Sequence, residues 1–149
     1  MIKVWTDGAC SKNPGVGGWA YIIEDSTRNR SLRMSGSNPH TTNNKMELTA
    51  VIKALKKLKN HQQLTFYIDS QYVINGITQW LIKWKKNNWR KADKKPVLNL
   101  EHWQEIERLI QGKKISWNWV KAHADNKNNE ACDQLAKNEI KKLIHEKVS

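Results

Sequence analysis

Apolar and polar residues alternate along the first part of the chain. The segment from Ile2 to Ala9 (IKVWTDGA) has a period of two, which predicts a β-strand. After the turn-forming tract NPGVGG, the apolar run WAYII and the segment 30–35 follow at hairpin spacing. The chain is therefore predicted to open with three antiparallel strands.

From residue 41 to residue 58 the hydrophobic period lengthens to three or four. Leu48, Val51, Leu55 and Leu58 recur at this spacing, which predicts an amphipathic helix. Further strands are predicted at 64–68 and 115–120, and further helices at 70–78, 100–110 and 129–144. This order of elements predicts an α/β fold with one five-stranded mixed sheet, in which parallel strands are added to the first three and helices flank the sheet.

Length and charge narrow the class of protein. The 149 residues, 38% of them hydrophobic and 27% charged, suit one soluble domain, so we expect a single domain over residues 1–149. The net charge of +12 favours a polyanionic partner, either nucleic acid or an anionic membrane surface. No apolar run reaches the roughly 20 residues of a membrane span, and no signal-peptide pattern opens the chain. We therefore expect no membrane association.

The number and spacing of the cysteines indicate the cellular compartment. Cys10 and Cys132 are the two cysteines, and neither belongs to a CxxC pair or a Cys/His metal motif. Two cysteines are too few for a disulfide scaffold, so we interpret them as free thiols in a reducing cytoplasm. A cytoplasmic location is the resulting expectation.

Four acidic residues stand at unusual or informative positions. Asp7 lies within the first strand, where aspartate is disfavoured, although an aspartate at a strand end can also serve a turn. Glu47 falls on the core-facing side of its helix, and N-x-x-E from Asn44 also resembles a capping box. Asp69 closes the strand 64–68 and could equally cap the next helix. Asp133 borders the apolar stripe of the last helix, where a lone aspartate is usually solvated.

Together the four carboxylates suggest a metal centre. In a mixed sheet the first strand and the end of the strand before Asp69 can meet at one edge, with the two helices nearby. Oxygen ligands without histidine or cysteine suit hard cations such as Mg²⁺ or Mn²⁺. Two such ions roughly 3.5 to 4 Å apart can activate water and stabilise a leaving oxygen during phosphodiester hydrolysis.

Several sequence blocks resemble those of type 1 ribonuclease H. They are TDGAC with NPGVGG, TTNNKMEL, IDSQYV with NGITQW, and WVKAHADNKNNEACDQLA, in that order across nearly the whole chain. The resemblance implies a ribonuclease H-like fold in which Asp7, Glu47, Asp69 and Asp133 bind the metal. It also implies that His123 assists proton transfer or product release, although the local sequence alone would suit an ordinary loop histidine.

The resemblance further implies a set of substrate contacts. Asn13, Asn43, Asn44 and Gln71 match residues that contact the hybrid in its minor groove, where RNA 2′-hydroxyls are displayed. Thr42 and Asn99 match part of a pocket for a DNA-strand phosphate. Two positions depart from the family pattern. His40 stands where relatives commonly have arginine, which implies a weaker or pH-dependent phosphate contact, and Ala122 stands where glycine often precedes the loop histidine.

A basic, tryptophan-rich segment covers about residues 80–96. It is interpreted as a protrusion that contacts DNA-strand phosphates, matching the handle of bacterial family members, while Tyr72 and Trp80 match positions that line the DNA channel. Its expected phosphate contacts are Lys83, Lys85 and Lys86. Alternatively, the tryptophans pack on the body of the protein and the lysines are merely solvated.

The sequence therefore predicts an endoribonuclease that hydrolyses the RNA strand of RNA/DNA hybrids without sequence preference. By resemblance it uses two Mg²⁺ ions, or Mn²⁺ as a substitute, once substrate is bound, and it leaves 5′-phosphate and 3′-hydroxyl ends. We expect a monomer without a small-molecule cofactor. Two alternatives remain, namely a non-catalytic module that binds hybrid or duplex, and an enzyme of the same superfamily that acts on DNA alone.

Overall fold

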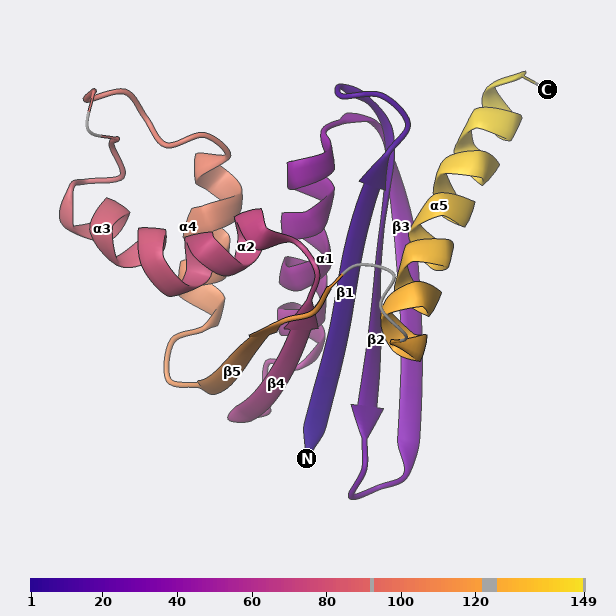
Figure 1. Cartoon of the computed structure of the whole chain (residues 1–149), viewed down its shortest axis with the longest axis horizontal. Coiled ribbons are helices and arrows are strands. Elements are labelled where there is room, and N and C mark those ends of the chain that lie inside the picture. Colours follow the sequence, from indigo (N-terminus) through magenta and orange to yellow (C-terminus); the bar gives the residue numbers. More distant parts are fainter. Residues whose placement is uncertain (92, 122–125, 149) are drawn as a thin grey trace.

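One mixed sheet organises the fold (Figure 1). The structure is a computed structural model that describes residues 1–91, 93–121 and 126–148. The strands are β1 (Ile2–Cys10), β2 (Gly15–Asp25), β3 (Arg30–Thr41), β4 (Gln63–Ile68) and β5 (Lys114–Trp119). Their order across the sheet is β3-β2-β1-β4-β5, with β1, β2 and β3 antiparallel and β4 and β5 added in parallel. This confirms the predicted α/β class and the predicted ribonuclease H-like sheet.

Helices cover both faces of the sheet. They are α1 (Asn43–Lys57), α2 (Gln71–Asn75), the π-helical turn η1 (Gly76–Trp80), α3 (Leu81–Lys86), α4 (Leu100–Leu109) and α5 (Lys127–Val148). In Figure 1, α1 lies on one side of the sheet and α5 on the other. No helix in the described ranges is both long enough and apolar enough to cross a membrane.

The central strand β1 contributes to two cores. Val4 is fully buried in the larger core, which α1 and α4 help to form with strand residues such as Phe66. Trp5, the next residue, belongs to a second core that includes Cys132 and Ala136 of α5. Because both faces of β1 are buried, a charged residue within this strand, such as Asp7, is enclosed by protein and not by solvent.

The glycine-rich tract departs from the sequence prediction. We expected the glycines of GVGG to form the hairpin, but they lie inside β2. A Cβ on Gly18 would come within 2.2 Å of the carbonyl oxygen of Ala136, so the glycine allows α5 to pack directly on the β2 backbone. Strand β3 also continues to Thr41, well beyond the expected end near residue 35.

The helix expected at 70–78 is in fact interrupted. It consists of α2, then η1, and continues into α3. Gly76 begins the π-helical turn, and a Cβ there would lie 2.0 Å from the ring of Trp103. The close approach of α4 to this turn therefore requires glycine, which is a long-range contact that hydrophobic periodicity does not report.

Candidate active site

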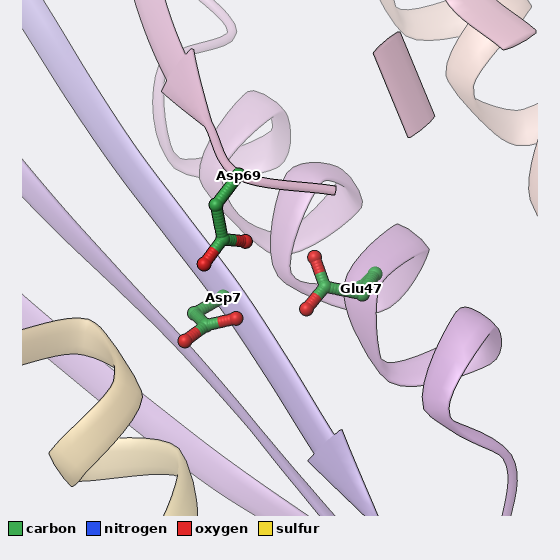
Figure 2. A group of neighbouring side chains, drawn as sticks. All are labelled: Asp7, Glu47 and Asp69. Carbon is green, nitrogen blue, oxygen red and sulfur yellow. The ribbon is translucent and has the colours of Figure 1, made fainter. Parts of the chain in front are cut away.

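Three carboxylates meet at the end of the β1–β4 strand pair (Figure 2). The parallel register pairs Thr6 with Ile68, which places the next residues, Asp7 and Asp69, side by side. Glu47 reaches them from α1, and one ligand atom from each of the three residues lies within 4.8 Å of the others. The sheet register and the position of α1 together create this acidic group.

Gly8 permits the approach of α1. A Cβ at this position would lie 2.3 Å from the backbone nitrogen of Glu47, so a larger residue would push the helix away. The Gly8 amide donates hydrogen bonds to Asp7 Oδ1 at 2.9 Å and to Glu47 Oε1 at 2.8 Å. Sequence reasoning did not assign Gly8 a role, although its position directly after Asp7 in TDGAC was a usable signal.

The two innermost carboxylates are almost inaccessible to solvent. Asp7 is 4% exposed and Glu47 is 5% exposed. Within the described part of the chain, Glu47 Oε2 is buried without a hydrogen-bond partner. A buried carboxylate oxygen without a donor is costly unless a cation or proton satisfies it. The geometry and the oxygen-only donor set fit a hard divalent cation.

Burial and mutual repulsion change the acidity of this group. Burial raises the pKa of Asp7 from 3.8 to about 7, and the charges of Asp69 and Asp133 add to the increase, while hydrogen bonds from Glu47 and Gly8 oppose it. Burial also raises the pKa of Glu47 well above its usual value. The charge of Asp7, and the hydrogen bond between the two side chains, raise it further. A bound cation would reverse this preference for the neutral forms.

Asp133 occupies the periphery of the acidic group. It lies on α5, and its charge contributes to the raised pKa of Asp7. Its carboxylate is not part of the group of three within 4.8 Å. Instead, Asp133 Oδ2 lies 3.0 Å from Lys137 Nζ, one helical turn away. The aspartate is therefore near the centre but paired with a lysine that our sequence reasoning overlooked.

The structure contradicts the capping alternatives for two of these acids. Thr42 is the N-cap of α1, and its hydroxyl accepts from the Lys45 amide at 3.2 Å, so the capping box that we considered for Asn44 and Glu47 is wrong. Likewise Ser70, and not Asp69, caps α2. The backbone carbonyl of Asp69 accepts from Trp119 Nε1 at 3.1 Å.

The predicted minor-groove residues gather near the start of α1 and of α2. Asn13 Oδ1 accepts from the Asn43 amide at 2.9 Å, which ties the loop before β2 to the first turn of α1. Asn44 follows on the same turn and is half-buried, while Gln71 is exposed as the first residue of α2.

The predicted phosphate-contact residues occupy adjoining positions. Asn99 adopts a left-handed conformation with φ 60°, and its Nδ2 donates to the Tyr72 hydroxyl at 3.1 Å. Thr42 caps α1, as described above, and His40 is exposed near the end of β3. His40 and Asn99 line two separate hollows that both include Lys45 and His102 in their walls.

The tryptophans of the basic segment pack on the protein, as the alternative interpretation expected, and the phosphate contacts of its lysines stay a prediction. Tyr72, Trp80, Trp84 and Trp103 form a closed ring of aromatic contacts, with centroid separations of 5.4 to 5.8 Å between neighbours. The expected phosphate contacts Lys83, Lys85 and Lys86 are all exposed. Lys85 Nζ lies 2.7 Å from Glu107 of α4, so that lysine is paired within the protein.

Two positions of interest fall outside the described residues. These are His123, expected to assist catalysis, and Ala122, where the family pattern often has glycine. Both assignments stay predictions.

The fold and the acidic centre define a class of protein, an α/β enzyme built around a site for divalent cations. The family model for RNase H matches residues 1–141. The chain therefore belongs to the ribonuclease H family, and it is a metal-dependent nuclease that hydrolyses phosphodiester bonds. Its sequence is similar to those of proteins named ribonuclease H in several bacteria.

Three relatives show how far the sequence similarity extends. The protein from Bradyrhizobium sp. (strain ORS 278) is 49% identical over 94% of this chain and 90% of its own length. The protein from Treponema denticola is 46% identical over 96% of this chain and 99% of its own length. The one from Ehrlichia ruminantium (strain Gardel) is 50% identical over 95% of each chain.

Solved structures share the fold. LC9-RNase H1, described as a type 1 RNase H with the type 2 active-site motif, is 30% identical with a TM-score of 0.79 and is matched over 92% of this chain and 70% of its own. LC11-RNase H1, solved in complex with an RNA/DNA hybrid, is 22% identical with a TM-score of 0.73. The match covers 97% of this chain and 99% of LC11-RNase H1. At that identity the second structure supports the fold alone.

Proposed function

We propose that this protein hydrolyses the RNA strand of RNA/DNA hybrids, without sequence preference, and leaves 5′-phosphate and 3′-hydroxyl ends. The observation that carries the proposal is the group formed by Asp7, Glu47 and Asp69, within which a buried Glu47 oxygen has no donor in the described structure. Membership of the ribonuclease H family and the 49% identity with a protein named ribonuclease H support the choice of substrate.

Asp7, Glu47, Asp69 and Asp133 are the residues that would hold two Mg²⁺ ions, or Mn²⁺ as a substitute. Such ions supply water activation and stabilisation of the leaving oxygen when they are bound. The chain itself orients the ligands, since the Gly8 amide holds one oxygen of Asp7 and one of Glu47 in place. His123 is proposed to assist proton transfer or product release.

Recognition of the hybrid is proposed to use both strands. Asn13, Asn43, Asn44 and Gln71 would donate to and accept from the RNA 2′-hydroxyls, which distinguish RNA from DNA. Thr42, Asn99 and the exposed lysines of the protrusion would contact DNA-strand phosphates, consistent with the net charge of +12. Phosphate contacts of this kind raise affinity without reading sequence.

Further features complete the proposal. We propose a single domain over residues 1–149, with the basic protrusion at about 80–96, that acts as a cytoplasmic monomer and needs no small-molecule cofactor.

The test compares cleavage of a labelled RNA/DNA hybrid with cleavage of matched RNA/RNA and DNA/DNA duplexes, in Mg²⁺, Mn²⁺ and EDTA. We expect metal-dependent loss of the hybrid's RNA strand alone, and loss of that activity in Asp69→Asn. Asp93→Asn is the matched control, because Asp93 is an exposed aspartate of the protrusion, paired with Lys91. Cleavage of the DNA duplex, or hybrid binding without cleavage in either metal, would contradict the proposal.

A further inference from the structure

A basic hollow lies between α1, the end of β3 and the start of α4. Its volume is about 380 Å³. Lys45, Thr49 and Lys53 line it from α1 at four-residue spacing, which places them on one side of the helix. His40 and His102 line it from β3 and α4. With Trp19 of β2, four separate elements therefore contribute to one concave surface, which lies apart from the acidic group and shares only His40 with the predicted phosphate contacts.

The hollow carries positive charge without compensation. Every ionisable side chain in its lining is a lysine or a histidine, and no carboxylate belongs to it. Among the described residues, neither Lys45 nor Lys53 has a carboxylate within ion-pairing distance. Lys53 Nζ instead lies 5.7 Å from the ring centroid of Trp19, a cation–π contact that keeps the ammonium group at the hollow.

Lys45 and His102 connect this hollow to the predicted phosphate-contact region. A second hollow, of about 330 Å³, is lined by Asn99 together with these same two residues and with the carboxylate-bearing Glu101. Burial lowers the pKa of His102, and the charge of Lys45 lowers it further, while Glu101 opposes the shift. The positive charge of Lys45 thus acts on the shared wall and favours the neutral imidazole of His102, so the lysines supply the positive charge there and His102 can supply a hydrogen bond.

We propose that the hollow of Lys45, Lys53 and His102 is a second anion subsite, which binds the DNA-strand phosphate next to the one contacted at Thr42 and Asn99. This inference rests on the proposed function, because it assumes that the same hybrid is bound. Because the two hollows share a wall, we assign them to consecutive phosphates of the DNA strand.

The test compares Lys53→Gln with Lys57→Gln. Both lysines are exposed on α1 and both substitutions remove one positive charge, but Lys57 does not line the hollow. Binding of a fluorescent hybrid is measured in EDTA at several salt concentrations. We expect Lys53→Gln to weaken binding several-fold and to lower the slope of log K against log salt by about 1. Lys57→Gln should change both quantities less, and Lys53→Arg should restore them.

A second measurement locates the phosphate. Hybrids are prepared with one neutral methylphosphonate linkage at successive positions of the DNA strand. The linkage that replaces the phosphate at Lys53 should weaken binding by the wild-type protein several-fold but should not further weaken binding by Lys53→Gln. The linkage that replaces the neighbouring phosphate, at Thr42 and Asn99, should weaken binding by both proteins. Equal behaviour of Lys53→Gln and Lys57→Gln, or interference only from RNA-strand linkages, would overturn the inference.

The two proposals fail in different ways. The binding measurements need no cleavage, so they test the subsite even if the wild-type protein binds hybrid without cutting it, an outcome that contradicts the proposed function alone. Normal hybrid cleavage with no specific effect of Lys53→Gln contradicts the subsite alone. A wild-type protein that does not bind hybrid contradicts both.

Discussion

Asp7 and Glu47 share one backbone donor, because the Gly8 amide lies 2.9 Å from Asp7 Oδ1 and 2.8 Å from Glu47 Oε1. A single neutral donor cannot offset two buried carboxylates that also repel each other. The raised pKa values of both groups follow chiefly from burial, to which the charges of neighbouring carboxylates add, and this one donor does not offset them. The metal-free protein therefore holds its acidic centre at a cost in stability, and cation binding would relieve that cost.

Asp7→Asn should stabilise the metal-free protein while it abolishes cleavage. The folded-state pKa of Asp7 is about 7 and its ordinary value is 3.8, so folding loses stability as pH rises through this window. The substitution removes that loss, and we expect a gain of about 1 to 3 kcal/mol at pH 8 and little difference near pH 4. Urea unfolding in EDTA at both pH values measures the gain.

The control for this experiment is Asp93→Asn, at an exposed position with no comparable burial. It should leave the free energy of unfolding nearly unchanged at either pH. A gain for Asp7→Asn that is equally large at pH 4 and pH 8 would show that the effect comes from packing and not from ionisation.

The same acidity should make metal activation dependent on pH. Carboxylates must lose their protons to bind a cation, and those of Asp7 and Glu47 hold them to unusually high pH. The Mg²⁺ concentration for half-maximal cleavage should fall as pH rises from 6 to 8, by up to about tenfold per pH unit for each proton released. Hybrid binding in EDTA over the same range serves as the control. A constant half-maximal concentration would mean that these acids are already ionised.

Local patterns in the sequence predicted most of the fold. The period of two around Val4 and the helical spacing of Leu48 and Leu55 correctly indicated their elements, because these residues face one continuous core. The π-helical turn at Gly76 was missed because its cause, the ring of Trp103, lies far away in the chain. The added length of β3 likewise depends on its pairing with β2.

In the candidate site, too, some features could be predicted from local sequence and others depend on contacts between distant parts of the chain. Family-like motifs identified Asp7, Glu47 and Asp69, but the residues taken singly suggested caps as readily as ligands. Only the register between β1 and β4 brings Asp7 beside Asp69, and only the packing of α1 on Gly8 brings Glu47 to them. The pairing of Asp133 with Lys137, by contrast, has helical i, i+4 spacing and was open to prediction from the sequence.

Tyr72→Phe should weaken both stability and substrate binding. The Tyr72 hydroxyl accepts from Trp103 Nε1 at 3.0 Å and from Asn99 Nδ2 at 3.1 Å, and Trp103 is fully buried. Loss of the hydroxyl leaves the indole donor without its partner, which should cost about 1 to 3 kcal/mol. Asn99 also loses its anchor, so KM for the hybrid should rise more than kcat falls. Urea unfolding and steady-state kinetics measure the two effects.

Tyr67→Phe is the control for that substitution, since the Tyr67 ring stacks on Trp5 at a centroid distance of 5.1 Å, away from Asn99. It should leave KM for the hybrid unchanged. A Tyr72→Phe variant that is destabilised but has a normal KM would separate the structural role of the hydroxyl from the predicted role of Asn99 in phosphate contact.

Gly76→Ala should be strongly destabilising, because the added Cβ would lie 2.0 Å from the Trp103 ring. Trp103 is fully buried and belongs to the aromatic ring of contacts with Tyr72 and Trp84, so it has no space into which to move. We expect a loss of about 2 to 4 kcal/mol in urea unfolding and an altered near-ultraviolet circular dichroism signal from the tryptophans. Gly112→Asn is the control, since no atom lies within 4 Å of a Cβ there and asparagine tolerates its φ of 73°. If Gly76→Ala kept wild-type stability and spectrum, the π-helical turn would have to adjust without moving Trp103, and glycine would not be required at this contact.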